Sequence, residues 1–166
     1  MSEFERVGEA NKQERSELSA VDHGKVVDEA RGDGLRGREV NEYACGSPEA
    51  LKGEYTEGEG PGIEVYSVGQ EIGIGAGITP FNFPAMIPMW MFGPAIATGN
   101  AFILKPSERD PSVPVRLVEL MLEAGLPEGI LQCLHGDKEM VDAILDHPAI
   151  GGISFVGSSD IAHYVY

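Results

Sequence analysis

Two short segments carry side chains whose types and spacing suit carbonyl chemistry beside a nucleotide. In A-G-I-T-P-F-N-F-P at 76–84, Asn82 lies on a turn after an apolar strand. A carboxamide there can stabilise negative charge that develops on a carbonyl oxygen. In G-N-A-F-I-L-K-P-S-E at 99–108, Lys105 closes a strand and Glu108 follows three residues later. A lysine and a carboxylate at the carboxyl end of a parallel strand can hold the hydroxyls of a ribose.

Each of these residues also has an ordinary structural interpretation. Asn82 could be only a turn residue, because asparagine favours loops and helix caps. Lys105 could be a surface charge, and Glu108 with Arg109 could begin a solvated helix. The motifs therefore need a fold that brings them together.

The elements that would position these residues follow from the pattern after Glu71. Apolar strands are predicted at 72–79, 101–105, 130–134 and 151–156, and helices from about Pro84, at 112–124, at 138–146 and from about Ser159. This alternation predicts an α/β fold, with a Rossmann-like parallel sheet and flanking helices. Gly73, Gly75 and Gly77 lie within a strand pattern, which favours close backbone packing over a dinucleotide-binding loop.

The residues before Glu71 have a different sequence pattern. Polar helices are predicted at 3–22 and 25–45, and G-S-P at 46–48 ends the second. A β-hairpin is predicted at 53–70, with E-G-E-G-P-G as its turn. The chain thus divides into a helical segment at 1–52, the hairpin, and the α/β part at 71–166.

Composition excludes several classes of function. The net charge of −15 disfavours a nucleic-acid partner, because phosphates would be repelled. The acidity is spread along the chain, as on the salt-tolerant surface of a halophile, although an ordinary acidic bacterial protein is the alternative. The apolar segment 83–98 contains three prolines and is too short to span a bilayer. With no secretory signal seen, we expect no membrane partner.

The cysteines and histidines offer little chemistry of their own. Cys45 ends a predicted helix, where the dipole disfavours a thiolate, and Cys133 is expected to be buried in an apolar strand. Two cysteines make no disulfide framework, so a reducing cytoplasm is the expected location. The histidines have no metal-ligand spacing, and we expect no metal site.

Several motifs, in order and spacing, resemble the NAD-dependent aldehyde dehydrogenases, and most nearly the CoA-acylating methylmalonate-semialdehyde dehydrogenases. They are I-T-P-F-N-F-P-A-M-I-P-M-W-M-F at 78–92, K-P-S-E-R-D-P-S at 105–112, E-A-G-L-P at 123–127, H-G-D-K at 135–138 and S-F-V-G-S at 154–158. The resemblance runs from about Asn11 to Tyr166 and implies a partial aldehyde dehydrogenase fold.

The resemblance implies roles for the residues of the cofactor site. Lys105 and Glu108 would bind the adenosine ribose of NAD, and Gly157 with Ser158 would contact its pyrophosphate. A carboxylate near the 2′-hydroxyl would repel the 2′-phosphate of NADP, whereas Arg109 could tolerate it. Without the resemblance, Gly157 and Ser158 could be a plain turn with a capping serine.

It also implies residues of the substrate site. Asn82 would hold the oxyanion, and Phe81 would line the cofactor cleft unless it is only a core aromatic. Arg36, in L-R-G-R-E-V at 35–40, would pair with the free carboxylate of a semialdehyde. Arg31 and Arg38 compete for that role, and a solvated helix charge is the alternative.

For the whole protein, the resemblance implies a piece of a longer, homo-oligomeric enzyme, with CoA as co-substrate and a small-molecule semialdehyde as substrate. The family's nucleophilic cysteine and general-base glutamate would lie downstream of Tyr166. Two rival interpretations remain. The chain could be a non-catalytic NAD-binding or subunit-interaction remnant, or part of another aldehyde dehydrogenase that yields a free acid.

Overall fold

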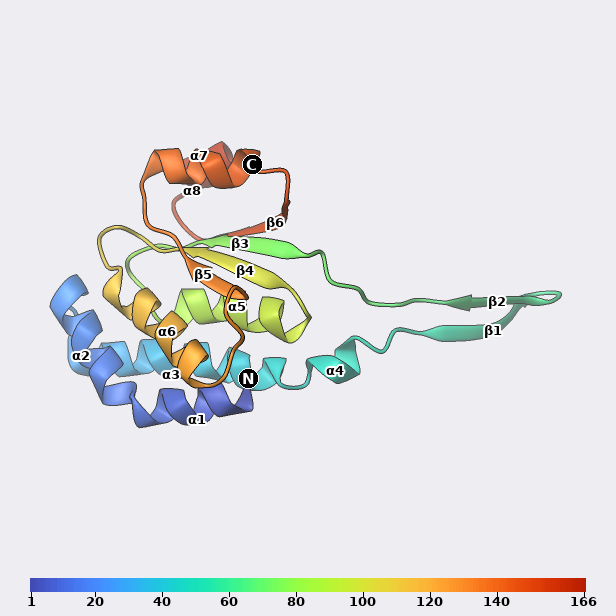
Figure 1. Ribbon diagram of the computed structural model, residues 1–166, viewed down its shortest axis with the longest axis horizontal. Coiled ribbons are helices and arrows are strands. Elements are labelled where there is room, and N and C mark those ends of the chain that lie inside the picture. The colour runs from blue at the N-terminus through green and yellow to red at the C-terminus, as the bar shows by residue number, and fades with distance from the viewer.

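The computed structural model describes residues 1–166, and its helices lie on both faces of a small parallel sheet (Figure 1). The N-terminal helices are α1 (Ser2–Ala10), α2 (Lys12–His23), α3 (Val27–Ala44) and the short α4 (Ser47–Ala50), followed by the hairpin strands β1 (Tyr55–Gly60) and β2 (Ile63–Tyr66). The α/β part contains β3 (Ile74–Ile78), α5 (Met86–Ala97), β4 (Ala101–Lys105), α6 (Ser112–Glu123), β5 (Leu131–Cys133), α7 (Lys138–Asp146), β6 (Ile150–Phe155) and α8 (Ser159–Val165). No helix is long and apolar enough to cross a membrane.

The four strands of the α/β part form a parallel sheet in the order β5-β4-β3-β6. This arrangement confirms the predicted α/β fold. The chain moves outward from β3 through β4 to β5, and then returns to place β6 on the other side of β3. The order therefore reverses between β3 and β6, and ligands of open α/β sheets bind at such a point. Ile78 pairs with both Lys105 and Phe155, so three strands end side by side.

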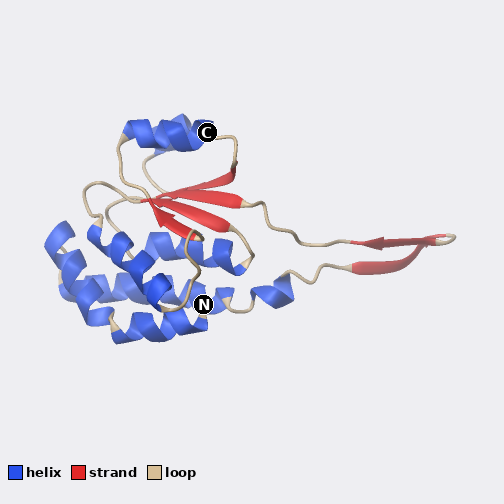
Figure 2. Ribbon diagram, in the orientation of Figure 1, coloured by secondary structure: helices blue, strands red, loops and turns tan.

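The helices divide between the two faces of the sheet. Figure 2 shows α5 and α6 between the sheet and the N-terminal helices, with α7 and α8 on the opposite face. Helix α5 is apolar on every side, because it packs against the sheet and against α3 at once. The central core residues are Met86, Met89, Phe92, Phe102, Leu104, Val113, Leu117 and Leu120.

Two glycines permit close packing in this core. A Cβ on Gly77 of β3 would lie 2.7 Å from Cζ of Phe102, as expected for a strand glycine that serves packing. A Cβ on Gly37 of α3 would lie 2.2 Å from Cε of Met89 and 3.1 Å from the Met86 Cα. Gly37 thus lets α3 approach α5 closely, and this packing compensates for the poor helix propensity of glycine.

The prediction of one helix at 3–22 was wrong, because the chain breaks at Asn11 into α1 and α2. Asn11 has φ −106° and ψ 16°, and its side-chain Nδ2 donates a hydrogen bond to the Val7 carbonyl at 2.9 Å. This local bond competes with helix continuation. The helix predicted at 25–45 is confirmed as α3, although G-S-P at 46–48 leads into α4 instead of a loop.

The hairpin is confirmed, but its predicted turn was too long. Residues 57–60 belong to β1, and only Pro61 and Gly62 form the turn. Glycine at 58, with φ 76°, accompanies a register shift between Glu57 and Gly60 that lets the strand accommodate the glycines. The hairpin extends away from the helices and sheet (Figure 2), and its residues are largely exposed.

Candidate functional site

A cavity of about 520 Å³ opens where β3, β4 and β6 end. It lies at the point where the strand order reverses. Its walls are Ile78, Thr79, Pro80, Lys105, Ser107, Glu108, Asp137, Lys138, Val141, Phe155, Val156, Gly157, Ser158, Asp160, Ile161 and Tyr164. Four of the six residues predicted to bind the cofactor, Lys105, Glu108, Gly157 and Ser158, therefore line one cavity.

Lys105 and Glu108 form a pair on one wall. Nζ of Lys105 lies 3.4 Å from Oε2 of Glu108, and the lysine side chain is 6% exposed whereas the glutamate is 60% exposed. The Lys105 carbonyl accepts a hydrogen bond from Thr79 N–H, which anchors the strand end. A backbone hydrogen bond within Glu108, with the Lys105 and Arg109 cations, holds the pKa of Glu108 below its ordinary value. Glu108 is thus ionised and open to a ligand.

Gly157 and Ser158 form the opposite wall, directly after β6. The Val156 N–H donates to the Ile78 carbonyl at 3.2 Å, which keeps this turn beside the end of β3. Ser158 occupies the N-cap of α8, but its side chain makes no capping hydrogen bond. Gly157 and Ser158 both line the cavity.

Sequence reasoning missed two cavity residues that follow β5. Lys138 begins α7, and its ammonium donates to Asp142 at 2.8 Å and to the Tyr164 hydroxyl. It also lies 4.4 Å from the centre of the Tyr164 ring. H-G-D-K at 135–138 was the available signal, because it follows a strand at the same edge of the sheet. Asp137 caps α7, and its side chain accepts a hydrogen bond from the Glu139 N–H at 3.2 Å.

Phe81 and Arg109 are not among the residues that line this cavity. The Phe81 ring stacks on His23 with centroids 5.9 Å apart. The Arg109 guanidinium lies 5.2 Å from the centre of the Phe81 ring. The structure thus joins these two residues to each other and to α2. Arg109 follows Glu108 in sequence but does not line its cavity.

A second hollow, of about 570 Å³, brings Asn82 and Arg36 together. Its other walls are His23, Lys25, Asp28, Glu29, Gly32 and Phe83. The Asn82 carbonyl accepts a hydrogen bond from Nζ of Lys25 at 2.8 Å, which fixes the turn against the start of α3. Lys25 and Arg36 also lie 5.3 and 6.0 Å from the centre of the Phe83 ring. Two cations, Lys25 and Arg36, and two carboxylates, Asp28 and Glu29, thus line this hollow together with Asn82.

The competing arginines lie elsewhere. Arg31 donates to Gln13 on α2 at 2.7 Å, and Arg38 donates to Glu9 on α1 at 2.6 Å. Of the three, only Arg36 lines the hollow that contains Asn82.

Both cysteines are free thiols. Cys133 is partly buried, not fully buried as expected, and burial raises its pKa to about 11. Cys45 is exposed, and its thiol donates to the Asn41 carbonyl at 3.4 Å. Neither residue lines either cavity. No group of three or more metal-ligating side chains is present.

The fold and the two cavities can now be compared with known proteins. The model of the aldehyde dehydrogenase family matches residues 1–166, so the chain belongs to the aldehyde dehydrogenase family. It is similar to a malonate-semialdehyde dehydrogenase of Pseudomonas aeruginosa, at 55% identity over 98% of this chain and 33% of the relative. It is also similar to a mitochondrial, acylating methylmalonate-semialdehyde dehydrogenase of Arabidopsis thaliana, at 44% identity over 100% of this chain and 27% of the relative.

Solved structures agree with these relatives. A provisionally named methylmalonate-semialdehyde dehydrogenase from Sinorhizobium meliloti, complexed with NAD, superposes with a TM-score of 0.97 at 62% identity, covering 99% of this chain and 34% of that one. The methylmalonate-semialdehyde dehydrogenase of Oceanimonas doudoroffii gives 0.98 at 50% identity, covering 100% and 34%. The chain thus spans about a third of the length of these relatives. It has part of the aldehyde dehydrogenase fold.

Proposed function

We propose that this chain is the NAD-binding portion of a CoA-acylating methylmalonate- or malonate-semialdehyde dehydrogenase. The enzyme would oxidise a semialdehyde in the presence of CoA to an acyl-CoA, with reduction of NAD to NADH. The observation that carries the proposal is the Lys105–Glu108 pair in a cavity at the reversal of strand order. The semialdehyde names of the relatives and the NAD complex of one of them support the same choice. We propose a cytoplasmic location.

The cofactor would be held by two walls of that cavity. Lys105, buried and fixed by its strand, would donate to a ribose hydroxyl, and the ionised Glu108 would accept from the other. The Glu108 charge would repel a 2′-phosphate, so NAD is favoured over NADP. Gly157 and Ser158 would receive the pyrophosphate. We assign Phe81 and Arg109 to the rim of this site, since neither lines its wall.

The substrate would enter the second hollow. The Arg36 guanidinium would pair with the free carboxylate of the semialdehyde, and the Asn82 carboxamide would stabilise the oxyanion. NAD supplies the acceptor for the hydride that leaves the carbonyl carbon. Because Cys45 and Cys133 line neither cavity, we propose that a cysteine outside these residues attacks the aldehyde. CoA would then take the acyl group.

We also propose that the full-length enzyme is a homo-oligomer. The hairpin β1–β2 exposes Ile63, Val65 and Tyr66, which are 50–73% accessible, and extends from the rest of the chain (Figure 1). Exposed apolar side chains on a projecting ribbon are well suited to cover another subunit.

NAD binding to the chain tests the cofactor assignment. Replacing both Lys105 and Glu108 by Ala removes two hydrogen bonds to charged groups, each typically worth about 1.5–3 kcal/mol. We therefore expect calorimetry to show NAD binding weakened by at least about tenfold. Lys52→Ala with Glu49→Ala removes a matched pair, 2.7 Å apart, formed by a residue of α4 and one just after it, and this variant should bind NAD like the wild type. Equal affinity in all three proteins would refute the ribose assignment.

The substrate assignment is tested in an enzyme that carries this sequence within the full family length. Arg36→Leu should lower kcat/KM for methylmalonate and malonate semialdehydes by about 10- to 100-fold, and hardly change it for propanal, which has no carboxylate. Arg31→Leu removes an arginine from the same helix and serves as the control. A uniform fall in kcat/KM for all three aldehydes would mean that Arg36 has a structural role.

Assays with and without CoA distinguish an acylating enzyme from one that makes a free acid.

A further inference from the structure

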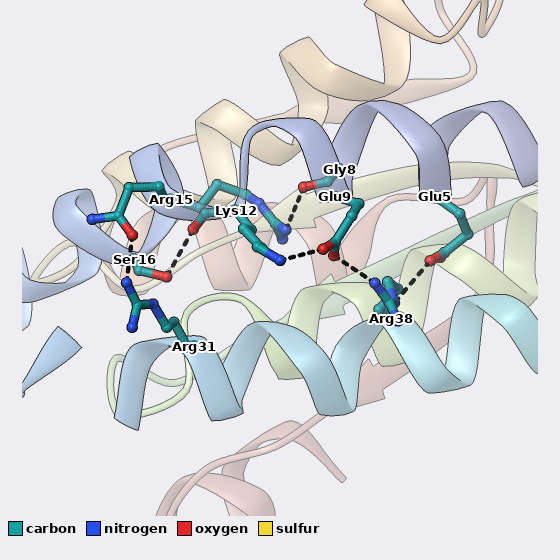
Figure 3. Close-up of polar contacts among 9 residues, drawn as sticks. Glu5, Gly8, Glu9, Lys12, Arg15, Ser16, Arg31 and Arg38 are labelled. Atoms are coloured by element: carbon teal, nitrogen blue, oxygen red, sulfur yellow. Dashed lines mark hydrogen bonds and ion pairs between the residues drawn. The ribbon is translucent and has the colours of Figure 1, made fainter. Parts of the chain in front are cut away.

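A third cavity, of about 260 Å³, lies between the α1–α2 pair and α3 and shares no residue with the two hollows described above. Its charged walls are the cations Lys12, Arg15, Arg31 and Arg38 and the single carboxylate Glu9. Figure 3 shows these side chains converging from α1, α2 and α3. Four cations around one carboxylate are unexpected in a chain of net charge −15. We call this cavity the basic pocket.

Arg15 is the most buried of the four cations and has no counter-ion within ion-pair distance. It is 8% exposed, and Nη2 donates to the Gly8 carbonyl at 2.8 Å. Its Nε is buried and has no hydrogen-bond partner. Burial lowers the pKa of Arg15 from its ordinary value, although the Glu5, Glu9 and Asp33 carboxylates oppose this. A buried cation without a direct counter-ion is costly, so a counter-charge in contact with Arg15 would stabilise the protein.

The surrounding carboxylates are engaged with other groups. Glu9 is shared between Lys12 and Arg38, with its Oε2 2.6 Å from the arginine. Asp33 accepts hydrogen bonds from the N–H groups of Ala85 and Met86 at 3.1 and 3.0 Å.

Glu5 is the remaining carboxyl group near Arg15, and its surroundings make it a weaker acid. Glu5 lies 3.5 Å from Arg38, and burial raises the pKa of Glu5 to about 7, which reduces its negative charge near neutrality. Asp28 also pairs with Arg31 at 3.0 Å, so Arg15 is the one cation of the four that has no carboxylate partner.

A buried hydroxyl supplies the second, independent observation. Ser19 lines the basic pocket, is 2% exposed, and its Oγ has no hydrogen-bond partner. A buried polar group without a partner is rare, and it usually marks a bound water, ion or ligand. Ser19 and the Arg15 Nε thus leave two unused polar groups at one buried site, both able to donate.

We propose that the basic pocket binds the phosphate group of a small anion. Arg15 and Ser19 would donate hydrogen bonds to the phosphate from the buried end of the pocket. Arg31 and Lys12, whose side chains are 51% and 59% exposed, would contact the phosphate from the solvent side. Arginine forks match the geometry of phosphate oxygens, and a dianion best balances several cations. The volume is several times the roughly 30 Å³ of a liquid water, so it holds a phosphate with a small organic group.

Calorimetric titration with inorganic phosphate tests this site, against sodium chloride of equal ionic strength. The wild-type chain should bind phosphate, and Arg15→Gln should weaken binding at least about tenfold, equivalent to about 1.4 kcal/mol. Arg6→Gln is the matched control, because Arg6 is on α1, is 70% exposed and lies outside the pocket. It should bind phosphate like the wild type. Heat no greater than that of chloride, or equal binding by Arg15→Gln, would overturn the proposal.

Two further measurements keep the test decisive if Arg15→Gln does not fold. Arg31→Gln and Lys12→Gln alter exposed side chains and should each weaken phosphate binding several-fold, whereas full affinity in both would refute the site. In the wild type, phosphate should shift the nuclear magnetic resonance of the Arg15 Nε–H. An unmoved resonance at saturating phosphate would also refute it.

The source of the phosphate is distinguished by comparing inorganic phosphate with glycerol phosphate. Tighter binding of the ester identifies a phosphorylated metabolite as the ligand, and equal or weaker binding identifies free phosphate. Replacement of Lys105 and Glu108 by alanine should leave phosphate binding unchanged. The phosphate site and the NAD site can therefore fail independently.

Discussion

Asp110 should make the protein less stable as the pH rises from about 4 to about 7. It lies in the loop between β4 and α6, is 1% exposed, and neither carboxylate oxygen has a hydrogen-bond partner. Burial, followed by the charge of Asp22, raises the pKa of Asp110 from 3.8 to about 7. Lys25 opposes this shift and Asp33 adds to it. The folded protein therefore favours the neutral carboxyl.

The sign and size of the effect follow from this shift. Below pH about 4, Asp110 is protonated in the folded and unfolded states and contributes nothing against folding. Between about 4 and 7 only the unfolded state loses the proton, so the free energy of unfolding falls as the pH rises. A shift of about three pKa units corresponds to at most about 4 kcal/mol. Relaxation and water entry reduce this to about 2 kcal/mol, or roughly 4–8 °C in Tm.

Urea denaturation of the wild type and Asp110→Asn between pH 4.5 and 8.5 provides the measurement. The variant cannot ionise, so it should be more stable than the wild type at pH 8 by about 2 kcal/mol, and the gap should close near pH 4.5. Asp146→Asn makes the same change at an exposed aspartate and should show no such divergence. Burial also raises the pKa of Glu5 to about 7, and this affects the wild type and the variant alike. A gap that is independent of pH, or a variant less stable at pH 8, would refute the reasoning.

Two other outcomes are expected. Gly93→Ala would place a Cβ 1.7 Å from Oδ1 of the fully buried Asn41, so urea denaturation should show that the free energy of unfolding falls by about 1–3 kcal/mol. In Gly32→Ala, the new Cβ meets nothing closer than 3.8 Å, so this substitution should be neutral or stabilising. The 166-residue chain should form no NADH from methylmalonate semialdehyde, NAD and CoA, because its two thiols line neither cavity. NADH formation that Cys45→Ala or Cys133→Ala abolishes would contradict this.

Local patterns were sufficient to predict the α/β part of the fold. Each strand is a short apolar run, and the helices between them end or begin at residues such as Gly125 and Asp137. Parallel strands must end at one edge of the sheet, so the positions of Lys105 at the end of β4 and Gly157 just after β6 are enough to place both at that edge. Lys105 and Glu108 are three residues apart, and this spacing alone keeps their side chains close.

Local patterns were less reliable where side chains compete with regular structure. The break at Asn11 depends on one side-chain hydrogen bond to Val7, which helical periodicity does not reveal. The glycines at 58 and 60 have low strand propensity, yet both belong to β1, where Gly60 pairs with Ile63 and Gly58 lies in the register shift.

Only the tertiary structure decided which distant side chains meet. Arg36 and Arg31 lie on one helix, but they face different neighbours, and the packing of α3 against α5 and α2 assigns Arg36 to the hollow beside Asn82. Phe81 lies on His23 instead of lining the cofactor cavity, because α2 packs beside that turn. The basic pocket needs three helices at once, and the burial of Arg15 depends on all of them. Desolvation and unpaired polar atoms are properties of packed surroundings, so they have no counterpart in residue order.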